Sequence, residues 1–99
     1  MAADLVLTPE TEQDVSESYG WYESRRPGLG EDFLTCVDAC IGAICRTPEL
    51  HPIVHENYRR ALVRRFPYAI FYELAGNTLT IYCVFHNSRD PQKWRERLA

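Results

Sequence analysis

Residues 66–94 limit the possible fold more than any other part of the chain, because they read as two strands joined by a tight turn. The segment from Tyr68 to Leu74 is rich in aromatic and β-branched residues, and the Ala-Gly-Asn sequence at 75–77 includes a glycine that tolerates positive φ. From Thr78 to Phe85 two sets of residues alternate. One predicted face of this second strand carries Leu79, Ile81, Cys83 and Phe85. The segment predicts an antiparallel β-hairpin.

A polar cluster follows the second predicted strand directly, in the sequence His-Asn-Ser-Arg-Asp at 86–90. The guanidinium of Arg89 can bind phosphate with two parallel hydrogen bonds, and the imidazole of His86 can exchange protons near neutral pH. The structural alternative is that His86 only hydrogen-bonds the start of a following helix beside Asp90, and that Arg89 and Asp90 form a local ion pair. Both readings stay open at the level of sequence.

The front half of the chain predicts a short strand and a helical hairpin. Asp4 to Leu7 is apolar enough for a first strand, and Thr8 and Pro9 are typical of a helix N-cap and first helical position. This helix is expected to end near Arg26, because Pro27-Gly28 is a turn signal. A second amphipathic helix begins between Leu29 and Glu31 and ends before Thr47-Pro48.

The remaining segments complete one α+β domain, residues 1–99. Residues 49–56 are predicted to be an irregular connection, Tyr58 to Arg65 a strand, and Gln92 to Leu98 a short helix capped by Asp90. The predicted order is β-α-α-β-β-β-α. A helical hairpin packed on an antiparallel sheet is the expected two-layer arrangement.

Charge divides the chain into an acidic front and a basic back. Residues 1–56 carry three arginines against eleven acidic residues, a net charge of −8, whereas residues 57–99 carry eight basic against three acidic residues, a net charge of +5. This asymmetry favours an anionic partner for the basic part, either nucleic acid or an acidic protein segment. The alternative is internal complementarity between acidic helices and a basic sheet.

Cysteine spacing and hydropathy exclude several classes of protein. Cys36 and Cys40 share a helix face, Cys45 lies on the opposite side, and no CxxC pair is present. The cysteines, including Cys83, are therefore expected to act as small buried hydrophobic residues, and we predict no metal site and no cofactor. No apolar run approaches the roughly 20 residues that cross a bilayer, so we expect a cytoplasmic protein without membrane contact.

The motifs of the back half resemble the ParE/RelE superfamily of small bacterial toxins, including plasmid stabilisation proteins. In that superfamily a "PY.I.Y" strand, a glycine-containing turn and a final strand ending in "H..RDP..W" recur. The matching positions are Pro67-Tyr68, Ile70, Tyr72, Gly76, His86, Arg89-Asp90-Pro91 and Trp94. The resemblance implies the RelE/ParE-like fold, and the predicted order of elements agrees with it.

In the RelE-like branch, the resemblance implies a ribosome-dependent messenger-RNA endonuclease with His86 and Arg89 as catalytic residues. The basic residues and one aromatic residue are candidates for binding phosphate or a protein target: Arg60, Arg64, Arg65, Arg89, Lys93 and Trp94. Trp94 is interpreted first as a packing residue, with base stacking as the alternative. Two positions depart from the nuclease pattern, since Ala69 stands where a basic residue is typical and Asn87 where a tyrosine or basic residue is typical.

These departures favour the ParE-like branch. That branch implies a non-enzymatic toxin of a type II toxin-antitoxin module, which binds and blocks DNA gyrase and is neutralised by a cognate ParD/RelB-like antitoxin. An acidic antitoxin tail would complement the basic back half. The ribosome and messenger RNA remain the alternative target, and an inactive orphan that only binds antitoxin is the third possibility.

Overall fold

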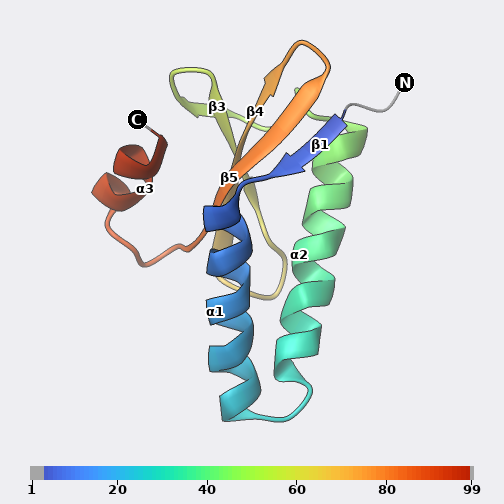
Figure 1. The fold of residues 1–99 in the computed structure, drawn as a ribbon, viewed down its shortest axis with the longest axis vertical. Coiled ribbons are helices and arrows are strands. Elements are labelled where there is room, and N and C mark those ends of the chain that lie inside the picture. The colour runs from blue at the N-terminus through green and yellow to red at the C-terminus, as the bar shows by residue number, and fades with distance from the viewer. Residues whose placement is uncertain (1–3, 99) are drawn as a thin grey trace.

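The computed structural model describes residues 4–98, which form three helices and five strands (Figure 1). In chain order they are β1 (Asp4–Leu7), α1 (Pro9–Arg25), α2 (Leu29–Arg46), β2 (Ile53–His55), β3 (Tyr58–Leu62), β4 (Tyr68–Ala75), β5 (Thr78–His86) and α3 (Pro91–Leu98). The α+β class is confirmed, and so is the predicted order of elements apart from the additional strand β2.

The five strands form one sheet in the order β1-β5-β4-β3-β2. β1 runs parallel to β5, whereas the other neighbouring strands are antiparallel. The sheet is therefore mixed, and the prediction of a purely antiparallel sheet is wrong for β1. Tight turns impose antiparallel pairing only on strands that follow each other directly. β1 and β5 are separated by most of the chain, so no such turn fixes their direction.

The segment between α2 and β4 differs from its prediction at two places. Residues 49–56 were expected to be irregular, but they contain β2, which pairs with β3 across a turn where Glu56 has a φ of 49°. β3 ends at Leu62 instead of continuing to Arg65. Arg65 has a φ of 71°, which lies outside the extended region and is incompatible with a continuing strand.

The helical hairpin begins and turns as its sequence predicts. Thr8 caps α1 by accepting the backbone N–H of Thr11 at 3.1 Å, and the buried Thr11 hydroxyl donates to the carbonyl of Ile81 in β5 at 2.8 Å. The carboxylate of Glu23 accepts the backbone N–H groups of Gly28 and Gly30, each at 3.0 Å. These bonds satisfy N–H groups at the start of α2 that no helical carbonyl reaches.

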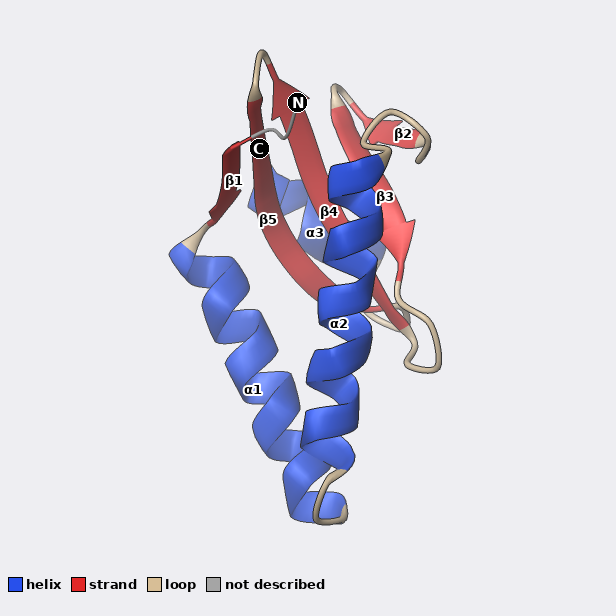
Figure 2. Ribbon diagram, turned by 90° about the vertical axis from the view of Figure 1, so that its right-hand side faces the viewer, coloured by secondary structure: helices blue, strands red, loops and turns tan. Residues whose placement is uncertain are grey.

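Helices cover both faces of the sheet. The α1–α2 hairpin packs on one face, and α3 lies on the opposite face (Figure 2). The hairpin side buries the larger core, which includes Tyr22, Phe33, Ile70, Tyr72 and Ile81. The α3 side buries Phe71, Cys83, Phe85, Trp94 and Leu98. α3 thus extends the predicted two-layer arrangement by partly covering the second face.

A β-bulge in β5 places the residues that follow it on the opposite face of the sheet from the one that regular alternation predicts. Phe71 is opposite Cys83, but Tyr72 is opposite Ile81, so Tyr82 is an additional residue without a partner in β4. The prediction that Leu79, Ile81, Cys83 and Phe85 share one face is therefore wrong. Leu79 and Ile81 pack under the hairpin, whereas Cys83 and Phe85 pack under α3.

The structure shows how deeply the cysteines are buried and whether its helices have the length and apolar character of membrane spans. Cys83 is buried, as predicted, whereas Cys36 and Cys40 are only half-buried; the prediction of a buried thiol is wrong for Cys45, which is exposed. Among residues 4–98, no three histidine, cysteine or acidic side chains lie close enough together to hold a metal ion. None of the helices formed by these residues is both long and apolar enough to span a membrane.

Candidate functional site

His86 lies on the hairpin side of the sheet because of the bulge at Tyr82. Its ring meets that of Tyr68 edge to face, with centroids 5.1 Å apart. The backbone N–H of Ser88 donates to Nδ1 of His86 at 3.0 Å, and the Ser88 hydroxyl lies 2.7 Å from the same nitrogen. A backbone N–H can only donate, so Nδ1 accepts and the proton of the neutral ring sits on Nε2. The local partner of His86 is thus Ser88 rather than the start of α3.

Arg89 is exposed and lies directly after the turn that follows β5. Its guanidinium is 4.5 Å from the ring centroid of Phe85. It forms no ion pair with a carboxylate among residues 4–98. Asp90 instead caps α3 by accepting the backbone N–H of Gln92 at 3.0 Å, so the alternative of an Arg89–Asp90 ion pair is wrong. Arg89 is therefore free to bind an anionic group of a partner.

Two pockets meet at His86 and Arg89. The first, which we call the α1 pocket, has a volume of about 320 Å³ and lies between α1 and the end of β5. The second, the α3 pocket, has a volume of about 290 Å³ and lies between the sheet and the start of α3. Phe85, His86 and Arg89 line both of them.

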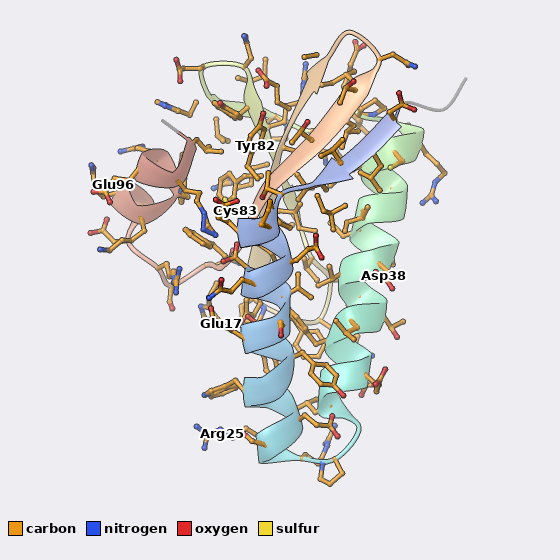
Figure 3. The ribbon with its side chains drawn as sticks, viewed as in Figure 1. Glu17, Arg25, Asp38, Tyr82, Cys83 and Glu96 are labelled. Atoms are coloured by element: carbon orange, nitrogen blue, oxygen red, sulfur yellow. The ribbon has the colours of Figure 1, made fainter. Side chains whose placement is uncertain are left out.

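The α1 pocket combines acidic and aromatic residues with the two candidate catalytic residues. Its α1 wall carries Asp14, Glu17, Trp21 and Tyr22, and Tyr68 lies opposite. Glu17 extends from the side of α1 that faces away from α2 (Figure 3). Burial, followed by the neighbouring Tyr68, raises the pKa of Tyr22 to about 12, so this phenol stays protonated at neutral pH. The acidic wall opposes the binding of a nucleic-acid backbone in this pocket.

The α3 pocket combines cations with an apolar floor. Arg60, His86, Asn87 and Arg89 supply its polar groups, whereas Phe71, Phe85 and Trp94 supply aromatic rings. Trp94 is buried and stacks on Phe71 with ring centroids 4.7 Å apart. His86 is the only residue of this lining whose side chain can serve as a general base or a general acid, because the other polar side chains are two guanidinium groups and one amide. Cleavage of RNA needs both a general base and a general acid, so the lining fits anion binding better than cleavage.

The other predicted binding residues lie outside both pockets. Arg65 is drawn toward the hairpin, where its guanidinium is 3.9 Å from a carboxylate oxygen of Asp32. Arg64 and Lys93 are exposed, on the loop after β3 and on α3. The structure thus brings together Arg60, His86, Arg89 and Trp94 in the lining of the α3 pocket, which does not include Arg64, Arg65 or Lys93.

An ion pair that the sequence did not predict fixes α3 beside this site. Arg97 of α3 donates to both carboxylate oxygens of Asp14 in α1, at 2.6 Å each, and Asp14 also accepts the backbone N–H of Val84 at 3.1 Å. The Arg97 guanidinium lies 4.9 Å from the ring centroid of Phe85. Asp14 and Arg97 are far apart in the sequence, and no local motif marks either of them as a partner.

The fold and the sequence both resemble known toxins. A chain from the chromosomal ParDE TA system of P. aeruginosa superposes with a TM-score of 0.76 at 14% identity, covering 85% of this chain and 95% of that one. This likeness concerns the fold. No curated protein sequence matches the chain significantly. The family model described as the ParE toxin of the type II toxin-antitoxin system parDE matches residues 5–91. The chain therefore belongs to the ParE toxin family.

Proposed function

We propose that this toxin halts bacterial growth by binding and blocking DNA gyrase, and that it contacts its target through the surface around Arg89. The observation that carries the proposal is the lining of the α3 pocket, which has two arginines and an aromatic floor but one proton-exchanging group. A toxin that binds its target needs complementary charge and shape rather than a general acid and base. Arg60 and Arg89, neither of which forms an ion pair among residues 4–98, supply cations for an acidic surface of the target.

Exposed cations around the α3 pocket extend this surface. Lys93 lies on the first turn of α3, beside the pocket wall formed by Trp94. Arg64 follows β3, which contributes Arg60 to the pocket. Charges at the rim of an interface chiefly raise the association rate, whereas a guanidinium that is desolvated on binding contributes affinity. We therefore expect Arg89 and Arg60 to affect affinity most, with smaller effects at Arg64 and Lys93, and Arg65 to have little effect.

We also propose a cognate ParD/RelB-like antitoxin as the protein that neutralises the toxin, and the cytoplasm as its place of action. One solved structure with a similar fold comes from a ParDE system, which supports a toxin-antitoxin pair. A gyrase inhibitor has to reach gyrase on the chromosome, which supports the cytoplasm. An inactive orphan that only binds antitoxin would keep the fold but show no toxicity when expressed alone.

The competing function is ribosome-dependent cleavage of messenger RNA. The meeting of His86 with Arg89 at both pockets is the observation that favours it. In that case His86 would act as the proton-transfer group and Arg89 would stabilise the charged transition state. The acidic wall of the α1 pocket and the occupied Nδ1 of His86 count against it.

Pulse labelling separates the two targets. The toxin is induced without antitoxin in a bacterial host, and DNA and protein synthesis are followed over the first minutes. We expect DNA synthesis to fail first, with Arg89→Gln relieving the block and the control Arg46→Gln, at the far end of α2, leaving it unchanged. Immediate failure of protein synthesis that His86→Ala abolishes would refute gyrase as the target.

A further inference from the structure

α3 covers only one end of its face of the sheet, and the β4–β5 turn extends well beyond it (Figure 1). On the uncovered part of this face, side chains from neighbouring strands form a row. Val6 of β1 is opposite Thr80 of β5, and Thr80 is opposite Glu73 of β4. The antiparallel register of β3 with β4 places Tyr58 opposite Glu73 in turn. We call this region the open face, and its members are Val6, Tyr58, Glu73, Thr80 and Tyr82.

Two tyrosines and one carboxylate form a compact group at the centre of the open face. Tyr82 is the additional residue of the β-bulge and lies on the α3 side of the sheet (Figure 3). Its ring meets that of Tyr58 edge to face, with centroids 5.2 Å apart. The Tyr82 hydroxyl donates to Oε1 of Glu73 at 3.3 Å. All three side chains are half-buried, so each keeps part of its surface for contact with another molecule.

Glu73 carries a charge that no basic side chain balances. It forms no ion pair with a lysine, arginine or histidine among residues 4–98. Burial, followed by the charge of Glu73, raises the pKa of both Tyr58 and Tyr82, so the two phenols stay neutral at physiological pH. Val6 lies at the edge of the same face, with 44% of its side chain exposed. The open face thus presents one carboxylate among neutral aromatic and apolar groups.

We propose that the open face binds another protein through an arginine that pairs with Glu73 and is surrounded by apolar side chains. A protein that covers this face removes Glu73 from water, and an unpaired carboxylate makes that burial costly. A guanidinium offsets the cost, because it donates two hydrogen bonds to a carboxylate and stacks on tyrosine rings. A lysine ammonium provides the charge but not the planar contact, so arginine is the better anchor.

This occupant differs from the one that the α3 pocket favours. The α3 pocket offers Arg60 and Arg89 to an acidic surface, whereas the open face offers Glu73 to a cation. An acidic segment that binds at the pocket is repelled by Glu73 if it continues onto the open face. The open face therefore selects a different chemistry, and the proposal does not depend on gyrase as the target of the toxin.

A second copy of the chain is disfavoured as the occupant. Most homodimers are two-fold symmetric, so the same patch of both subunits meets at the interface. Such a pairing through the open face would bring the two Glu73 carboxylates together without a cation between them. Like charges that face each other at an interface oppose association. This favours a separate protein as the occupant.

A displayed peptide library tests the anchor. The library has short cyclic peptides whose central position is drawn equally from Arg, Lys, Gln and Glu and whose flanking positions are drawn from Val, Ile, Leu, Thr and Tyr. Peptides are selected on the full-length protein, and those that bind the Glu73→Gln variant equally well are removed. The remaining binders are expected to have Arg at the centre most often, with Lys second. A Gln or Glu centre among them, or no remaining binder, would overturn the proposal.

Affinity measurements test the pairing with Glu73. The selected arginine peptide, made synthetically, should bind Glu73→Gln about tenfold more weakly, because a charged pair is replaced by a contact with a neutral amide. The control Glu49→Gln removes the same charge from an exposed position in the loop after α2, so it should retain the affinity. Equal loss in the two variants would show that the peptide responds to net charge alone and would refute the proposal.

A second pair of variants locates the binding surface. Thr80 lies opposite Glu73, so Thr80→Arg supplies the cation within the chain and should abolish binding of the peptide. Thr35→Arg makes the same change at an exposed position of α2 and should leave binding unchanged, with thermal melts confirming that both variants fold. Binding that survives Thr80→Arg would refute the open face. Concentration-dependent dimerisation of the unmodified protein that Thr80→Arg abolishes would assign the face to a second copy and also refute the proposal.

Discussion

Replacing Asp14 by asparagine removes the charge that joins α1, β5 and α3. The side chains of Asp14 and Arg97 are 12% and 23% exposed, so the pair is mostly shielded from water. Breaking a fully buried pair costs about 3–5 kcal/mol, because the remaining charge keeps its desolvation cost without its partner. With partial exposure of Arg97 and a retained amide oxygen for Val84, we expect a loss of about 2–3 kcal/mol in the free energy of unfolding.

Urea unfolding followed by circular dichroism measures this loss. A decrease of about 2–3 kcal/mol lowers the urea midpoint by roughly 1–2 M at the m-values of small domains and the melting temperature by roughly 10–20 °C. The matched control is Glu17→Gln, which removes the same charge from an exposed site on α1 and should cost less than about 0.5 kcal/mol.

A double-mutant cycle isolates the pair itself. Arg97→Met should be destabilising by a similar amount, and the double variant should be clearly more stable than the sum of the two losses predicts, with a coupling above about 1 kcal/mol. Additive effects, or a loss below about 0.5 kcal/mol for Asp14→Asn, would show that this ion pair does not fix α3.

Three further predictions concern glycine, thiol and tyrosine chemistry. Gly20→Ala should stabilise the protein by about 0.5–1 kcal/mol, because an added Cβ would meet nothing within 4 Å. Gly30→Ala should destabilise the protein, because its Cβ would lie 2.8 Å from a tyrosine ring of α1. Thermal melts of the two variants measure both effects. A thiol reagent at neutral pH should modify the exposed Cys45 first and Cys83 only on unfolding, because burial hides the Cys83 thiol and raises its pKa to about 12. Mass spectrometry over time measures the order of labelling, and early labelling of Cys83 would contradict the prediction. Burial also raises the pKa of Tyr72 to about 12 from an ordinary value of 10.0. The neutral phenol therefore contributes stability that is fully present below pH 10 and is lost between pH 10 and 12. Urea midpoints that stay constant between these two pH values would contradict this prediction.

Local signals predicted the elements of the fold well. Thr8 and Pro9 start α1, Gly76 has a φ of 61° in the β4–β5 turn, and Asp90 caps α3, as their residue types indicate. Each of these features depends on hydrogen bonds or backbone angles within a few residues. The parallel pairing of β1 with β5 depends on packing across most of the chain, and nothing in the sequence near Leu7 or Ile81 indicates it.

The bulge at Tyr82 escaped prediction because β5 is buried on both faces. In a strand with one solvent-exposed face, a shift of register interrupts the alternation of apolar and polar residues in the sequence. Here Cys83, Val84 and Phe85 are all buried, so the sequence near the bulge gives no sign of the change of face. This one residue decides that His86 turns toward the hairpin.

The candidate site was predictable only where its residues are close in sequence. His86 and Arg89 were identified from one short motif, and the structure places both at the same two pockets. Glu17 and Asp14 belong to the same region but come from α1, and their contribution follows from tertiary packing of α1 against β5. Arg65 was a candidate binding residue together with Arg60, whereas the structure gives it a positive φ and places its guanidinium 3.9 Å from Asp32 on the hairpin.

Supercoiling of plasmid DNA by purified gyrase shows directly whether the toxin blocks this enzyme. The purified toxin is added to gyrase, ATP and relaxed plasmid, and the supercoiled product is measured over a range of toxin concentrations. We expect the unmodified protein to inhibit supercoiling, Arg89→Gln to need a concentration at least about tenfold higher, and Arg46→Gln to inhibit as well as the unmodified protein. Full gyrase activity at toxin concentrations that stop growth in cells would contradict it.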